Sequence, residues 1–276
     1  MSAPFRPKYS LAYFGSKLRA VERVVSLARQ HRAQLFVEPF AGSAVCSLNA
    51  AHHLGIDWVG FDVDERIVAL HRWLGSTTRD EVVALLDEHD RRLGDIEKVQ
   101  KSGGDVYVGF DIRDARYPHG FEVAMRLASA SLLGTMHIHR MRRKPTRRWL
   151  DSLPAWARGA VALGGYERAS AFDVEGAFFL LDPPYVGTVA DYSSGADGAQ
   201  ERQGGGFDLA RFVSWACSLR SPRVITYGAD APDVMPGFEW QPLFTRGGSA
   251  VLTGERTGSS SEEARREWYT VLPGTW

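Results

Sequence analysis

The stretch QLFVEPFAGSAVCSLNAAHHLGIDWVGFD, Gln34 to Asp62, decides the fold. Residues 34–40 are short and apolar with a proline near their end, which predicts a buried strand. Small residues open the segment 41–55 and Gly55 closes it, which predicts a helix. Residues 57–62 predict a second strand. A strand, a helix and a strand in this order predict two parallel strands that are joined by a crossover helix.

The pattern continues on both sides of this unit. Apolar residues at helical spacing predict helices over 16–32 and 64–74. After residue 75 the alternation stops, and it resumes with a buried strand in 176–185, a helix over 209–219 and a strand in 222–228. SAVLTG (249–254) and REWYTVL (266–272) predict a closing pair of strands. The expected fold is α/β: an open, mostly parallel sheet that is interrupted by a lobe of about 95 residues.

Composition excludes several classes of protein. The chain has 276 residues, of which 44% are apolar, and it carries 33 basic and 33 acidic residues. These values exclude collagen-like, coiled-coil and wholly disordered chains. Apolar runs such as AFFLL (Ala177–Leu181) are far shorter than the roughly 20 residues of a membrane helix. The N-terminus lacks the apolar core of a signal peptide, so we expect a soluble protein of the cytoplasm without a membrane partner.

The two cysteines, Cys46 and Cys217, are too few for a disulfide framework or a cysteine-rich zinc site. Both lie in apolar stretches that are expected to be helical, which predicts buried thiols. The histidine pairs, residues 52 and 53 and residues 137 and 139, match no metal motif. We therefore expect no metal.

Two acidic strand ends predict a nucleoside site. Glu38 ends the first strand, before a glycine-containing turn that lets a ligand approach backbone N–H groups. Asp62 ends the second strand, 24 positions later, near the roughly 20-residue spacing of nucleoside-binding units. A carboxylate there can bind both ribose hydroxyls. The turn lacks the G-x-G-x-x-G pattern, which disfavours a dinucleotide, whereas Glu38 suits a cationic nucleoside such as S-adenosylmethionine.

The tetrapeptide DPPY, Asp182 to Tyr185, follows a buried strand. Prolines restrict the backbone and remove N–H donors. Asp182 and the Pro183 carbonyl can therefore accept hydrogen bonds from one planar amino group, while Tyr185 stacks on the ring that carries it. Such bonds raise the electron density on the nitrogen and prepare it to attack a methyl group on sulfonium. A rigid turn with a core tyrosine is the simpler alternative.

These segments, in this order, resemble the α-group of DNA adenine-N(6) methyltransferases, the Dam-type family. YFGSK (Tyr13–Lys17), FVEPFAGSA (Phe36–Ala44), FDVD (Phe61–Asp64) and DPPY carry the resemblance. It implies a Rossmann-like, S-adenosylmethionine-dependent methyltransferase sheet with an inserted, mostly helical target-recognition lobe. Residues 1–75 and 171–276 would form the catalytic domain and residues 76–170 the lobe. Ser16, Ser43 and Ala44 depart from the family, which often has glycine there.

The resemblance also implies a role for each matching residue. Those that would hold the cofactor are Tyr13, Lys17, Glu38, Pro39, Phe40, Ala41, Gly42, Asp62 and Asp182. Those that would hold a flipped adenine are Asp182, Pro183, Pro184 and Tyr185. Tyr192 is a candidate for a loop that closes over the site. The implied activity is methyl transfer from S-adenosylmethionine to adenine in double-stranded DNA, in a bacterial or phage-encoded protein that serves restriction–modification, regulation or evasion of host defence.

DNA contact should appear as local basic charge. Residues 136–160 hold seven basic residues against one acid, whereas residues 61–105 hold eleven acids against seven bases. The zero net charge thus conceals a segregation of charge that suits a DNA-binding lobe. The expected DNA-binding residues, which could also form an ordinary solvated surface, are Arg140, Arg142, Arg143, Lys144, Arg147 and Arg148.

Three alternatives stay open. The first is a methyltransferase for another planar nitrogen, in cytosine, an rRNA base or a protein amide. Such rRNA and protein enzymes typically carry Asn in place of Asp182, and cytosine enzymes often carry Ser. The second is a catalytically silent relative that binds DNA. The third concerns assembly, because monomer and dimer are both compatible with the sequence.

Overall fold

The computed structural model describes residues 17–84, 87, 97–101, 104–108, 150, 153–185, 207–228, 230–244 and 267–276. Its helices are α1 (Val21–Gln30), α2 (Val45–Leu54), α3 (Glu65–Ser76), α6 (Leu153–Trp156), the 3-10 helix η3 (Tyr166–Phe172), α7 (Leu209–Ser218) and α8 (Ala231–Val234). Its strands are β1 (Leu35–Glu38), β2 (Asp57–Asp62), β3 (Glu97–Lys101), β4 (Gly104–Val108), β5 (Gly159–Leu163), β6 (Ala177–Leu181), β7 (Arg223–Tyr227), β8 (Gln241–Phe244) and β9 (Glu267–Leu272).

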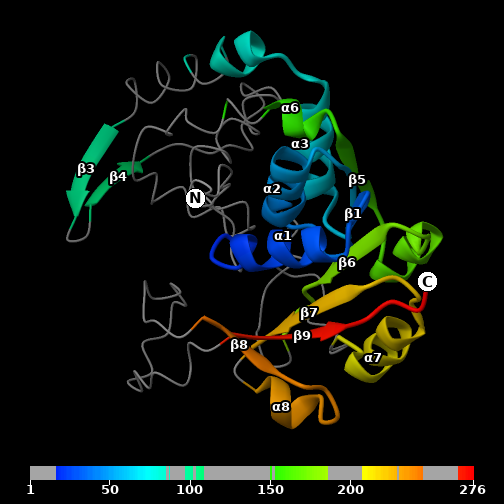
Figure 1. The fold of residues 1–276 in the computed structure, drawn as a ribbon. Helices are drawn as coiled ribbons and strands as arrows, with labels where there is room; N and C mark the ends of the chain where they lie inside the picture. Colours follow the sequence, from blue (N-terminus) through cyan, green and yellow to red (C-terminus); the bar gives the residue numbers. More distant parts are fainter. Residues whose placement is uncertain are drawn as a thin grey trace, which may run out of the picture.

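Seven of these strands form one sheet in the order β5-β2-β1-β6-β7-β9-β8 (Figure 1). The first five are mutually parallel, and β9 runs antiparallel to both β7 and β8. The chain builds outward from β1 in one direction through β2 and β5, and then in the other through β6 and β7. This arrangement confirms the predicted α/β fold with a Rossmann-like, mostly parallel sheet, and it puts the switch point of the topology between β1 and β6.

Successive side chains along the strands point to opposite faces of the sheet, where they form two hydrophobic cores. Phe36, Phe178 and Leu180 pack with α1, α2 and α3 on one face of the sheet. Val37 and Phe179, their neighbours along the strands, pack with α7 and η3 on the opposite face. Because both faces are covered, β6 is buried at all five positions, as its continuous apolar sequence predicts.

The predicted helices and strands of the sheet are present, with some corrections at the ends. The partners of β9 in the described chain are β7 and β8, so residues 241–244 form a strand that the sequence analysis missed. SAVLTG, the expected partner, lies outside the described residues. Cys46 is buried as expected, but Cys217 is exposed, because it lies on the solvent side of the amphipathic helix α7.

The boundary predicted for the inserted lobe is too late. Residues 159–163 form β5, which pairs in parallel with β2 along its full length and so belongs to the sheet. Within the described part of the lobe, β3 and β4 pair as antiparallel strands. Among the described residues, no helix combines the length and apolarity that a membrane crossing requires.

Candidate active site

A cavity of about 370 Å³ opens where β1, β2, β5 and β6 end. Eleven of its lining residues were expected at a cofactor or catalytic site: Lys17, Glu38, Pro39, Phe40, Ala41, Gly42, Asp62, Asp182, Pro183, Pro184 and Tyr185. The others are Ser43, Val45, Val63, Gly164, Gly165, Tyr166, Glu167 and Phe207. The cavity lies at the carboxyl ends of the parallel strands, which is where open α/β sheets bind ligands.

Glu38 ends β1 and is buried beneath the turn that opens α2. Its Oε2 atom accepts a 3.1 Å hydrogen bond from the Ser47 backbone N–H and another from the Ser47 hydroxyl. Burial raises the pKa of Glu38 to about 8, although both bonds from Ser47 act to lower it. A carboxyl group of this kind ionises readily only when a cation is close, so it is suited to a positively charged ligand.

Asp62 ends β2 and connects two turns. Its Oδ2 accepts a hydrogen bond from the Gly42 N–H and its Oδ1 one from the Asp64 N–H, each 2.9 Å long. Burial raises the pKa of this carboxyl group, while the backbone bonds act to lower it. A carboxylate has about four acceptor positions, and the Val63 backbone N–H also acts on this carboxylate, so at least one position remains for a hydroxyl group of a ligand in the cavity.

Gly42 is held from its carbonyl side as well. His71, in α3, has its Nε2 atom 2.8 Å from the Gly42 oxygen, and Trp156 Nε1 donates to His71 Nδ1 over 3.0 Å. Because an indole N–H can only donate, Nδ1 must accept, which leaves Nε2–H to donate to Gly42. Burial lowers the pKa of His71 to about 4 and keeps the ring neutral. The turn over residues 39–44 is thereby held rigidly before any ligand arrives.

The turn itself has an unusual backbone. Gly42 and Ala44 have φ angles of 45° and 49°, in the left-handed region that glycine favours. Ala44 stands where we expected glycine from the resemblance, and the backbone keeps the glycine-like conformation there. Gly60, in β2, allows the turn to pack closely, because a Cβ atom on it would lie 2.9 Å from the Ala41 Cβ.

The DPPY segment leaves β6 at the centre of the sheet. Asp182 Oδ1 accepts a 2.8 Å hydrogen bond from the Thr226 hydroxyl of β7, and Oδ2 forms a 2.9 Å ion pair with Lys17 Nζ. Burial would lower the pKa of Lys17, but the neighbouring Asp182 carboxylate, with smaller effects from Tyr185 and Glu267, raises it above its usual value. Asp182 is therefore oriented through both of its oxygens.

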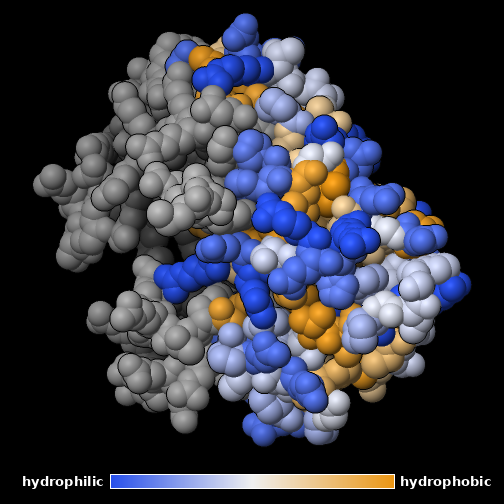
Figure 2. Space-filling model, viewed as in Figure 1, coloured by the Kyte–Doolittle hydropathy of each residue, from blue (hydrophilic) through white to orange (hydrophobic). Residues whose placement is uncertain are grey.

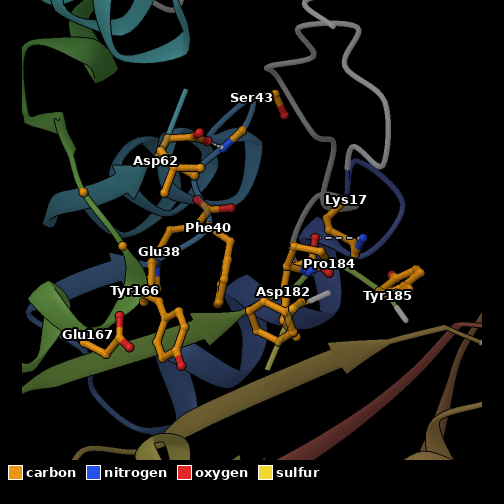
Figure 3. Close-up of a pocket in the computed structure, with 18 of the residues that line it drawn as sticks. Lys17, Glu38, Phe40, Ser43, Asp62, Tyr166, Glu167, Asp182, Pro184 and Tyr185 are labelled. Carbon is orange, nitrogen blue, oxygen red and sulfur yellow. Dashed lines mark hydrogen bonds and ion pairs between the residues drawn. The ribbon is translucent and has the colours of Figure 1, made fainter. Parts of the chain in front are cut away.

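Tyr185 lies beside this ion pair. Its ring centroid is 4.9 Å from that of Tyr227 and 5.4 Å from Lys17 Nζ. Burial raises the pKa of the Tyr185 hydroxyl, so it stays protonated. Figure 3 shows Lys17 and Tyr185 on one side of the cavity, with Tyr166 and Glu167 on the other.

An aromatic wall forms that other side. Tyr166 stacks on Phe40 with ring centroids 5.5 Å apart, and Phe207 contacts both rings. Glu167 beside it pairs with Arg211 over 2.9 Å. The sequence analysis missed Tyr166 and Glu167 because it assigned residues up to 170 to the lobe. The apolar segment GAVAL (159–163) followed by two glycines is the signal that could have identified them as a strand end.

Eight of the predicted site residues cannot be compared with the structure. Tyr13 and the six expected DNA-binding residues, Arg140, Arg142, Arg143, Lys144, Arg147 and Arg148, lie outside the described residues, as does Tyr192. Figure 2 shows one face of the molecule, on which the described residues present hydrophilic side chains with hydrophobic ones between them.

Comparison with known proteins gives a fold-level similarity only. No protein-family model matches the chain. No curated protein matches it either. Two solved structures of the rRNA methyltransferase AviRa from Streptomyces viridochromogenes are similar to it, at 14% and 13% identity and TM-scores of 0.41 and 0.38. The alignments cover 100% and 99% of this chain and 89% and 88% of AviRa. Similarity this low carries no information about substrate.

Proposed function

We propose that this protein transfers a methyl group from S-adenosylmethionine to the exocyclic amino group of a flipped adenine in duplex DNA. The observation that carries the proposal is one cavity in which the buried Glu38 and the half-buried Asp62 face an aromatic wall and in which Asp182 and Tyr185 form the opposite side. The first group of residues suits a cationic nucleoside, and the second suits a planar amino group on a ring.

The cavity residues fit the cofactor chemically. The volume of about 370 Å³ is within the range of small-molecule sites. Phe40 and Tyr166 offer flat surfaces for an adenine ring, and Asp62 has acceptor positions for ribose hydroxyls. Glu38 offers a carboxyl group to the ammonium end. When bound, S-adenosylmethionine supplies an activated methyl group on a sulfonium.

Asp182 and Pro183 act on the amino group that receives the methyl. A heteroaromatic amino group is a poor nucleophile because its lone pair is delocalised into the ring. Acceptance of its two N–H bonds by the Asp182 carboxylate and the Pro183 carbonyl localises electron density on the nitrogen. Thr226 holds Asp182 in place for this purpose, and Asp182 or water takes the proton that the product loses.

Adenine in duplex DNA is the favoured substrate for two reasons. Asp182 stands at a position where cytosine enzymes often carry Ser and where rRNA and protein enzymes typically carry Asn. The basic segment 136–160 supplies local positive charge for phosphate contacts in a chain of zero net charge. Tyr185 is the aromatic residue that would stack on an extruded base.

Incubation with tritiated S-adenosylmethionine and a choice of acceptors tests the proposal. Mixed-sequence duplex DNA, structured rRNA and a protein extract are supplied separately, and the labelled nucleoside is identified by mass spectrometry. We expect label in duplex DNA as N(6)-methyladenine, and none with the Asp182→Ala variant. Label in RNA, protein or cytosine would overturn the substrate assignment, and a failure to bind S-adenosylmethionine in calorimetry would overturn the cofactor assignment.

A further inference from the structure

Lys17 lies between two carboxylates that belong to different strands. Its Nζ atom is 2.9 Å from Asp182 Oδ2, after β6, and 3.8 Å from Glu267 Oε2, at the start of β9. We propose that Glu267 is a positioning residue that takes over the Lys17 ammonium when a substrate amino group engages Asp182. The catalytic role of this exchange rests on the proposed function, whereas the distances among Lys17, Asp182 and Glu267 do not.

The first step of the argument concerns Asp182. Both of its oxygens already have partners, the Thr226 hydroxyl and the Lys17 ammonium. An incoming amino group that donates to Asp182 must therefore share an oxygen with a cation or displace it. A shared oxygen is a weaker acceptor, because the ammonium withdraws the same electron density that the amino group needs.

The second step concerns charge during methyl transfer. The S–CH₃ bond breaks as the N–CH₃ bond forms, and the positive charge passes from sulfur to the attacking nitrogen until a proton leaves to Asp182 or water. A lysine ammonium on the same carboxylate oxygen opposes this developing charge. Enzymes accelerate such steps by arranging charge to favour the transition state, so Lys17 is best placed when it has moved off Asp182.

The third step concerns where Lys17 can go. Its side chain is 5% exposed, so the ammonium cannot move into water, and an unpaired buried charge is costly. Among the described residues, Glu267 Oε2 is a buried oxygen that accepts no hydrogen bond. Burial raises the pKa of Glu267, whereas Lys17 and Arg19 act to lower it, so a closer approach of Lys17 favours the ionised carboxylate. A movement of about 1 Å would bring Lys17 Nζ to ordinary ion-pair distance from it.

A stability cycle tests the exchange without any turnover. Thermal unfolding is compared for wild type, Asp182→Asn, Glu267→Gln and the double variant, all without cofactor. If either carboxylate can hold Lys17, each single variant keeps a counter-ion and the double variant loses it. We expect the fall in Tm of the double variant to exceed the sum of the single falls by about 3 °C, and this excess to vanish in a Lys17→Met background. Additive falls would overturn the proposal.

Kinetics then tests the purpose of the exchange. We expect Glu267→Gln to lower kcat by on the order of tenfold, as commonly follows loss of a group that orients a reacting residue, with little change in KM for S-adenosylmethionine. Glu175→Gln, an exposed glutamate at the opposite end of β6, is the matched control and should retain wild-type kinetics. An unchanged kcat in Glu267→Gln overturns the positioning role, whereas absence of turnover in wild type overturns only the proposed function.

Discussion

Replacement of Glu38 by Gln should make the protein more stable at neutral pH and less able to bind its cofactor. The two side chains have nearly the same shape, and the amide oxygen can still accept both hydrogen bonds from Ser47. The substitution therefore removes one property of Glu38, the ability to carry a negative charge in a buried site. Its effect on stability must depend on pH.

The size of the effect follows from the shift in pKa. The pKa of Glu38 is about 8 in the folded protein against 4.5 for an ordinary glutamate. As pH rises above 4.5, ionisation of this group stabilises the unfolded chain. The folded chain gains no such stabilisation until pH approaches 8, where its own carboxyl group ionises. The free energy of unfolding of wild type therefore falls by about 2.5 kcal/mol between pH 5 and pH 7 because of this group. Glu38→Gln has no such group and does not show this fall.

Urea unfolding of both proteins at pH 5, 6, 7 and 8 measures this difference. The stability of Glu38→Gln relative to wild type should rise across the series and level off above about pH 8. Calorimetry with S-adenosylmethionine should show affinity weakened about tenfold to a hundredfold, which is the loss of a charge-assisted contact. Wild type should release a proton on binding at pH 7 and the variant should not. Parallel stability curves would refute the reasoning, because they would mean that Glu38 is ionised in the empty protein.

Other substitutions test the remaining parts of the site. In Asp62→Asn the side-chain NH₂ replaces one of the two oxygens that accept hydrogen bonds from the backbone N–H groups of Gly42 and Asp64. The Kd for S-adenosylmethionine in calorimetry should rise about tenfold. An unchanged Kd would exclude a role for Asp62 in binding. Trp156→Phe removes the donor that sets the His71 tautomer and should raise KM for the cofactor severalfold with kcat nearly unchanged; a fall in kcat alone would contradict a role limited to the turn over residues 39–44. Replacement of Arg142 and Arg143 by Ala should reduce the slope of log affinity for DNA against log salt by about 2; an equal slope in filter-binding assays would place the phosphate contacts elsewhere.

The sequence could predict most of the central sheet. The run from Gln34 to Asp62 predicted β1, α2 and β2 in their observed order, and β2 has the predicted bounds. These elements are predictable because burial on both faces demands continuous apolar strands, and strand ends at one edge of a parallel sheet collect the polar ligand-binding residues. The same logic predicted Glu38, Asp62 and Asp182 as members of one site.

Elements with weaker local signals were missed. The strand β5 was assigned to the inserted lobe because GAVAL follows a long irregular segment and looks isolated along the chain. Its place is decided by pairing with β2, about 100 residues earlier in the sequence. Because β5 was missed, Tyr166 and Glu167, which follow it, were missed as well. The aromatic wall of the cavity was therefore not predicted.

The sequence by itself thus determined the α/β fold, the carboxylates at the strand ends and the DPPY turn, because these depend on local patterns of burial and on backbone restriction by proline. Only the tertiary structure decided which groups act on those residues. The Trp156–His71–Gly42 chain, the Thr226 bond to Asp182 and the position of Lys17 between Asp182 and Glu267 join residues 29 to 250 positions apart in the sequence. No local pattern encodes such contacts, because they arise when distant strands and helices pack around a common core.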